Sequence, residues 1–228
     1  QKWDSYRPIP LYQPETKLTR RRLSLETNIW SIDLLYCGSL PNIKTFMVAG
    51  TNPKVSFVHV NATSLEASVV WDTSPDLDQW TMSVKIADTD GDGKKEVIVG
   101  SFDNNIYTFE HVYRNTYRRT WRSPDLKHNE TFWDHVTDLT VGDTDQDGMM
   151  EIIAANNNVT YPQLYVFENI GNDRYAETQR IHLPEGAGPV VAISIGDDLD
   201  GDGVKEIVVA AKNKIYVYED TTLVWYEF

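Results

Sequence analysis

Three short segments of the chain carry carboxylates at one fixed spacing, and this spacing predicts a metal site in each. The acidic side chains fall at relative positions 1, 3, 5 and 9 of every segment. Four carboxylates so close together repel one another unless a cation holds them. Calcium takes six to eight oxygen ligands in a flexible geometry and therefore suits such a loop better than magnesium or zinc does. The predicted ligands are Asp88, Asp90, Asp92 and Glu96; Asp143, Asp145, Asp147 and Glu151; and Asp198, Asp200, Asp202 and Glu206.

A backbone carbonyl at position 7 would complete each site, and a glycine at position 6 permits the sharp turn that brings position 9 back to the metal. The carbonyls belong to Lys94, Met149 and Val204, and the glycines are Gly93, Gly148 and Gly203. An EF-hand opens in the same way but needs a Glu at position 12 and a helix on each side. Position 12 here is Val99, Ala154 or Val209. Ordinary polar hairpin turns are the other alternative, and three copies with identical spacing make that interpretation weak.

The segments recur at a constant interval, which predicts the architecture that positions them. Their first aspartates are residues 88, 143 and 198, an interval of 55 residues both times. A period near fifty residues is typical of a four-stranded propeller blade. Apolar stretches of strand type flank each segment, so each should be a hairpin loop. A third strand follows at 106–110, 164–168 and 215–219, and Trp71, Trp121 and Trp225 indicate a fourth, outer strand.

The sequence thus predicts an all-β fold, a β-propeller built of four-stranded antiparallel blades, with about four blades in this chain. The predicted units are a lead segment or outer strand at 1–29, a blade without a calcium loop at 30–78, and blades with a calcium loop at 79–131, 132–187 and 188–228. The first blade follows the same strand order, but its loop at 38–44 has no carboxylate. That blade should bind no calcium.

The pattern of strand, Asp-x-Asp-x-Asp-Gly-x-x-Glu and second strand resembles the FG-GAP or VCBS-type repeat of integrin alpha-subunit propellers and of secreted microbial proteins. The resemblance covers most of residues 30–228, and Val99-Gly100-Ser101 comes close to the Gly-Ala-Pro signature. It implies an extracellular or cell-surface location and a role in adhesion. Family propellers usually close with about seven blades. The chain is then a fragment of a larger protein, one member of a ring or filament, or an unusually small propeller.

The net charge of the chain indicates which classes of partner are unfavourable. The 34 acidic residues against 21 basic ones give a formal charge of -13, which disfavours nucleic acid and anionic membranes as partners. The sequence has no run of eighteen apolar residues, so it predicts no membrane span. Cys37 is the only cysteine, so no internal disulfide can form. Sequons at Asn61, Asn129 and Asn158 are candidate glycosylation sites.

Two functional classes remain open. The favoured one is a non-catalytic module that binds a protein or glycan partner, or assembles with itself. The alternative is a calcium-dependent polysaccharide lyase or a fragment of one, because some relatives with such loops have this activity. The five histidines are scattered at 59, 111, 128, 135 and 182, and none belongs to a zinc, triad or nucleophile-elbow pattern. No catalytic residue is therefore predicted.

Overall fold

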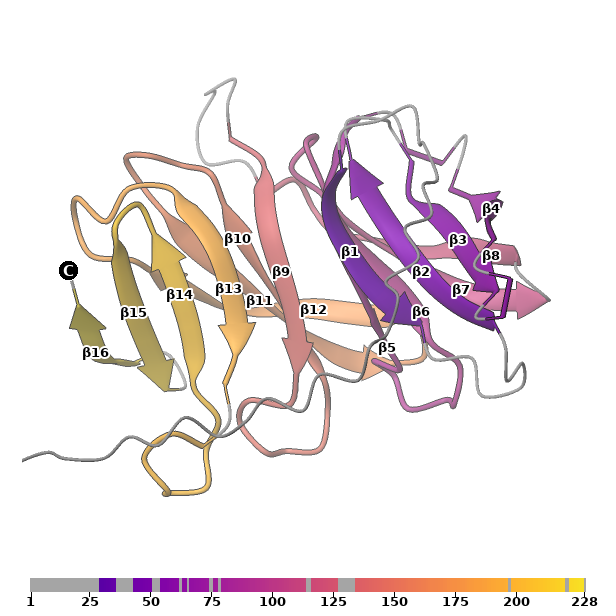
Figure 1. Ribbon diagram of the computed structural model, residues 1–228. Helices are drawn as coiled ribbons and strands as arrows, with labels where there is room; N and C mark the ends of the chain where they lie inside the picture. Colours follow the sequence, from indigo (N-terminus) through magenta and orange to yellow (C-terminus); the bar gives the residue numbers. More distant parts are fainter. Residues whose placement is uncertain are drawn as a thin grey trace, which may run out of the picture.

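The computed structural model describes residues 29–35, 43–50, 54–61, 63–64, 66–73, 76–77, 79–113, 116–126, 134–196, 198–219 and 222–227. Within these residues the strands form four sheets, each of four antiparallel strands (Figure 1). In every sheet the strands lie side by side in chain order, which is the topology of a propeller blade. The predicted all-β propeller fold is confirmed. The predicted lead segment lies outside the described residues apart from Ile29, as do Cys37 and most of the loop at 38–44.

The four blades follow one another along the chain. The first consists of β1 (Ile29–Leu35), β2 (Ile43–Gly50), β3 (Ser56–Asn61) and β4 (Ala67–Asp72). The second consists of β5 (Thr81–Ala87), β6 (Glu96–Ser101), β7 (Ile106–Tyr113) and β8 (Thr116–Arg122). The third consists of β9 (Val136–Gly142), β10 (Glu151–Asn156), β11 (Gln163–Gly171) and β12 (Arg174–His182). The fourth consists of β13 (Val190–Ile195), β14 (Ile207–Ala211), β15 (Lys214–Glu219) and β16 (Thr222–Glu227).

Strands that are apolar on both faces stack the blades face to face. Successive side chains of a strand point to opposite faces, so each such strand serves two junctions between blades. In β6, Val97 and Val99 pack with Phe57 of the first blade, whereas Ile98 packs with Phe167 of the third blade. All six residues of β6 and of β10 are buried. The hydrophobic core is therefore divided into three clusters, one at each junction.

Aspartates on the innermost strands tie neighbouring blades together. Asp138 of β9 accepts the Ser83 hydroxyl of the second blade at 2.7 Å and the Ile193 N–H of the fourth blade at 3.0 Å. Asp33 of β1 accepts the Ile86 N–H of the second blade at 2.9 Å. The inner strands approach closely enough that a Cβ on Gly100 would lie 2.6 Å from Val136 Cγ1. Glycine at this position thus lets the second and third blades meet.

The three acidic segments all lie along the same edge of the stacked blades. Each connects the first strand of a blade to its second, and in Figure 1 the three hairpins β5–β6, β9–β10 and β13–β14 lie along the lower edge of the molecule. They are named here the first Asp loop (88–96), the second Asp loop (143–151) and the third Asp loop (198–206). Within the described part of the chain, no helix is long and apolar enough to cross a bilayer.

Candidate metal centres

The backbone of each Asp loop turns where the sequence predicts. The position-6 glycines have φ values of 87° at Gly93, 88° at Gly148 and 102° at Gly203, a left-handed conformation that strains any residue with a Cβ. Position 4 is also left-handed in all three loops, and the second loop places Gln146 there, at φ 63°. The Gln146 side chain donates a hydrogen bond to the Gly203 carbonyl of the third loop. This contact offsets part of the strain that a non-glycine residue carries at position 4.

Backbone N–H groups orient the aspartates in the same way from loop to loop. In the first loop, Asp88 accepts the N–H groups of Gly91 at 2.8 Å and Gly93 at 3.1 Å. Asp90 accepts the N–H of Asp92, and Asp92 accepts the N–H of Lys94. The third loop repeats all four bonds, and the second repeats three of them. The carboxylates are therefore held in place by the loop itself.

The glutamate at position 9 gives the strongest sign that the loops fit a cation. Glu96 is fully buried, and its Oε2 accepts the N–H of Thr89 at 2.6 Å and the hydroxyl of Thr89 at 2.7 Å. Its Oε1 is buried and has no hydrogen-bond partner. Glu151 repeats this arrangement with Thr144, and its Oε1 also lacks a partner. A buried carboxylate oxygen without a donor is costly, and a bound cation would remove that cost.

The structure brings most, but not all, of the predicted ligands together. Only in the second loop do all four carboxylates, from Asp143, Asp145, Asp147 and Glu151, have oxygens within 4.8 Å of one another. The other two loops each gather positions 1, 3 and 9, namely Asp88, Asp90 and Glu96, and Asp198, Asp200 and Glu206. Asp92 instead forms an ion pair with Lys94 at 2.7 Å. Asp202 groups with Asp200 and with Glu219 of β15.

The third loop holds its glutamate less firmly than the other two do. Position 2 is Leu199, which donates only its N–H to Glu206 Oε2, at 2.9 Å. Leu199 has no hydroxyl to supply the second bond that Thr89 and Thr144 provide. Leu199 is also 61% exposed, whereas Thr89 and Thr144 are buried. We therefore expect the third loop to bind a cation more weakly than the second.

Burial raises the pKa of the two best-held glutamates. The pKa of Glu96 rises to about 7 and that of Glu151 to about 6, chiefly because burial disfavours the charged form, while the hydrogen bonds from Thr89 and Thr144 oppose the rise. The metal-free fold thus binds protons more readily than the unfolded chain does. Its free energy of unfolding should fall as the pH rises from about 4.5 to about 7.

Calcium should reverse this dependence, because the cation favours the ionised glutamates and its binding releases their protons. We expect the stabilisation by calcium to be small at pH 5 and large at pH 8. Denaturant melts at both pH values, with calcium and with EDTA, measure the difference. The double variant Glu96→Gln, Glu151→Gln is the control and should lose most of the pH dependence. An equal calcium effect at both pH values would contradict the assignment of these two ligands.

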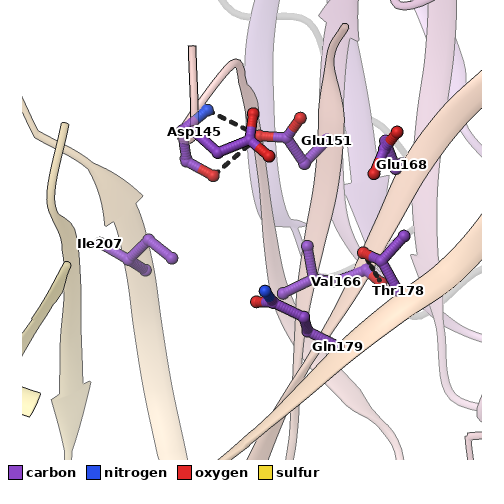
Figure 2. Close-up of a pocket in the computed structure, with 8 residues that line it drawn as sticks. Asp145, Glu151, Val166, Glu168, Thr178, Gln179 and Ile207 are labelled. Carbon is purple, nitrogen blue, oxygen red and sulfur yellow. Dashed lines mark hydrogen bonds between the residues drawn. The ribbon is translucent and has the colours of Figure 1, made fainter. Parts of the chain in front are cut away.

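A small polar cavity adjoins the second Asp loop. It has a volume of about 60 Å³ and lies between the third blade and Ile207 of the fourth (Figure 2). Asp145 and Glu151 line one end, and Glu168 of β11 faces them from the side. A cavity of this size holds a few water molecules. A larger cavity of about 360 Å³ lies by the third loop, lined by Leu199, Asp200, Glu206, Val217 and Val224.

The other predicted site residues differ in their burial and in their contacts. Asn158 is buried, and its amide nitrogen donates to Asp134 while its oxygen accepts the N–H groups of Thr160 and Tyr161. The folded chain therefore does not present this sequon for modification. Asn61 lies at the end of β3 beside an exposed turn, and Asn129 lies outside the described residues. The position-7 residues Lys94, Met149 and Val204 each donate their N–H to the aspartate at position 5, and ligation by their carbonyls stays a prediction.

Sequence reasoning missed the threonines and the tyrosine that shape the loops, and the aspartate that joins the inner strands. Thr89 and Thr144 hold the position-9 glutamates, and their recurrence at position 2 of two loops was a signal. Tyr175 of β12 forms a hydrogen bond with the Thr89 hydroxyl across a junction between blades. Tyr117 and Tyr175 each stand seven residues after the glutamate that ends a third-strand motif, so the spacing marks a repeated position. Nothing in the sequence pattern indicates that Asp138 bridges three blades.

Comparison with known proteins supports the repeat and the fold. Residues 143–209 match the family described as FG-GAP-like repeat. Two solved structures, both of BBS1N in complex with ARL6DN, one soaked with mercury and one with lead, are similar with TM-scores of 0.56 and 0.53. Sequence identity is 14% and 13%, and the alignments cover 90% and 92% of this chain. At this identity the likeness shows the fold alone.

The chain spans about half the length of these matched chains, 55% and 56% respectively. No curated protein sequence matches. The broadest family match covers residues 12–163, about two thirds of the chain, and its description is KICSTOR complex protein kaptin. With three blades of the described fold inside or overlapping that range, the chain belongs to the kaptin family of KICSTOR complex proteins.

Proposed function

We propose that this chain is a non-catalytic, calcium-stabilised propeller subunit that binds protein partners within a multiprotein complex. The single observation that carries the calcium part is the repeated geometry of Glu96 and Glu151. Each has one oxygen held by a threonine and one buried oxygen without a donor. The second Asp loop adds three aspartate oxygens within 4.8 Å, which is a ligand set of the kind that calcium prefers.

Two findings support the protein-binding part. The family description names a protein of the KICSTOR complex, and the similar BBS1N structures contain a protein partner. The fourth blade also exposes large apolar side chains on its strands and its Asp loop, as expected of a surface that contacts another protein or another blade. They are Val191, Leu199, Ile215 and Val224.

The cavity beside the second Asp loop argues against a lyase site at that loop. The cavity at the second loop, about 60 Å³, is too small for a sugar ring. The larger cavity is lined by apolar residues together with Asp200 and Glu206, which are themselves expected to hold the metal. Among the described histidines, His135 is buried and stacks on Phe102 with ring centroids 4.5 Å apart. The extracellular location and the adhesive role implied by the integrin resemblance stay predictions, and the proposal does not depend on them.

The proposal is tested by calorimetry and by co-purification. Titration of the metal-free chain with calcium should give three binding events per chain. The tagged chain should then co-purify with other subunits of the KICSTOR complex in calcium buffer, and less well in EDTA. The variant Glu96→Gln, Glu151→Gln should bind these subunits weakly, whereas Glu185→Gln, an exposed glutamate outside the loops, should bind them normally. A chain that takes up no calcium, or that recovers no subunit in either buffer, would refute the corresponding half of the proposal.

A further inference from the structure

A hairpin of the third blade reaches the first Asp loop of the second blade. The N–H of Asp173, between β11 and β12, donates to Asp90 Oδ2 at 3.0 Å. Two residues further along, the Tyr175 hydroxyl forms a hydrogen bond with Thr89 Oγ1. Asp90 and Thr89 occupy positions 3 and 2 of the loop. The next blade therefore contacts both a predicted metal ligand and the residue that holds another ligand.

The hydrogen bonds run in one direction. The Thr89 hydroxyl donates its only hydrogen to Glu96 Oε2 at 2.7 Å. The Tyr175 hydroxyl must therefore donate to Thr89 Oγ1, which gives a chain from Tyr175 through Thr89 to Glu96. Such chains polarise and strengthen their members, and Tyr175 and Glu96 are both buried. The chain ends on Oε2 and leaves Oε1 of Glu96 without a donor.

The second Asp loop shows what is special about the first. Thr144 holds Glu151 in the same way, but no described residue of the fourth blade donates to Thr144. Strand β15 ends at Glu219 after six residues, whereas β11 has nine residues and continues to Gly171. At the corresponding place, beside Thr144, the small cavity of Figure 2 remains. Within the described chain, a hydroxyl donor from the following blade is thus a property of the first loop, whereas the second loop contacts the fourth blade through the bond from Gln146 to the Gly203 carbonyl.

Tyr117 of β8 is the counterpart of Tyr175 at the preceding junction. It inserts into the first blade, where its ring lies 4.5 Å from Phe57 and 5.5 Å from Trp71 between centroids. Tyr175 likewise packs on Trp121, at 5.0 Å. The two tyrosines share the packing role, but the loop of the first blade has no carboxylate. The hydrogen bond toward a metal loop therefore separates Tyr175 from Tyr117.

We propose that Tyr175 is a positioning residue for the metal site of the first Asp loop, so that the calcium affinity of this site depends on the packing of the second and third blades. The inference rests on the proposed function. A ligand whose outer partners already hold it in place loses less freedom on binding, and the removal of such a partner commonly weakens metal affinity by about tenfold or more. Binding and blade contact are linked reciprocally.

The test compares Tyr175→Phe with Tyr117→Phe. Both changes remove one hydroxyl and keep the ring in its junction. They are made in a background with Glu151→Gln and Glu206→Gln, which leaves only the first site, and calcium affinity is measured by calorimetry. Tyr175→Phe should weaken binding about tenfold, and Tyr117→Phe should leave it within about twofold. Thr89→Val should weaken it at least as much, and adding Tyr175→Phe to Thr89→Val should cause little further loss.

Two other results for the tyrosine variants would contradict the inference. Unchanged affinity in Tyr175→Phe, or equal losses in both tyrosine variants, would overturn it and assign Tyr175 a packing role only. Melting of the metal-free variants in EDTA separates the two roles, because loss of packing lowers the melting temperature without calcium and loss of positioning does not. Absence of calcium binding in the unmodified chain would refute the proposed function itself, which is a distinct result.

Discussion

Removal of calcium should lower the melting temperature of this chain by about 15–30 °C. A ligand that binds only the folded state at a hundred times its dissociation constant contributes about 2.7 kcal/mol, so three independent sites contribute about 8 kcal/mol. For a chain of this size, each kcal/mol shifts the melting temperature by about 2–4 °C. The physical source of the effect is the set of loop carboxylates, including the buried glutamates Glu96, Glu151 and Glu206. Without a cation these groups repel one another, and Oε1 of Glu96 and of Glu151 has no donor.

Differential scanning calorimetry in EDTA, calcium and magnesium measures this effect. Calcium should restore the melting temperature, and magnesium should do so poorly because it requires a near-ideal octahedral site. The triple variant Glu96→Gln, Glu151→Gln, Glu206→Gln should melt at the same temperature with and without calcium. If the unmodified chain melts identically in EDTA and in calcium, the Asp loops are polar turns and the metal assignment is wrong.

Substitution of Asp138 by Ala should destabilise the fold by about 4 kcal/mol. The carboxylate accepts the Ser83 hydroxyl and the Ile193 N–H from the two neighbouring blades, and both donor residues are buried. An unsatisfied buried donor costs about 1–3 kcal/mol, and the variant leaves two. Because these bonds join three blades, the loss should loosen the inner strands as well as lower the free energy of unfolding.

Equilibrium unfolding in urea, with calcium present throughout, measures the loss. Asp138→Asn keeps one acceptor oxygen and should lose less stability than Asp138→Ala. Glu185→Ala removes the same charge from an exposed position and should change stability by less than about 0.5 kcal/mol. Equal effects of Asp138→Ala and Glu185→Ala would show that the bridging bonds contribute nothing to stability.

Both predictions concern the contacts that hold neighbouring blades together. Blades meet through apolar clusters, through the inner-strand aspartates and, at one junction, through the chain from Tyr175 to Glu96. A protein-binding propeller needs a rigid arrangement of its blades, because partner contacts are made by loops that the blades position. Calcium at the first Asp loop would directly stiffen the junction between the second and third blades.

The repeat determined much of this protein from sequence alone. The 55-residue interval, the strand-type flanks of each segment and the position-6 glycines predicted antiparallel blades with hairpin loops, and the structure has them. Local spacing was sufficient because a hairpin is a local element, whose turn residues and strand periodicity lie within a few residues of one another. The grouping of Asp143, Asp145, Asp147 and Glu151 followed for the same reason.

Contacts between blades were decided by the tertiary structure. Tyr175 meets Thr89 across 86 residues of sequence, and Asp138 meets Ser83 and Ile193 at a separation of 55 residues on either side. The pattern shows that a tyrosine or aspartate recurs in a blade, but only the stacking of the blades determines what it faces. The burial of Asn158 likewise depends on Asp134, which comes from the segment before β9. Periodicity specifies the units, and the packing between units specifies which of their side chains can act together.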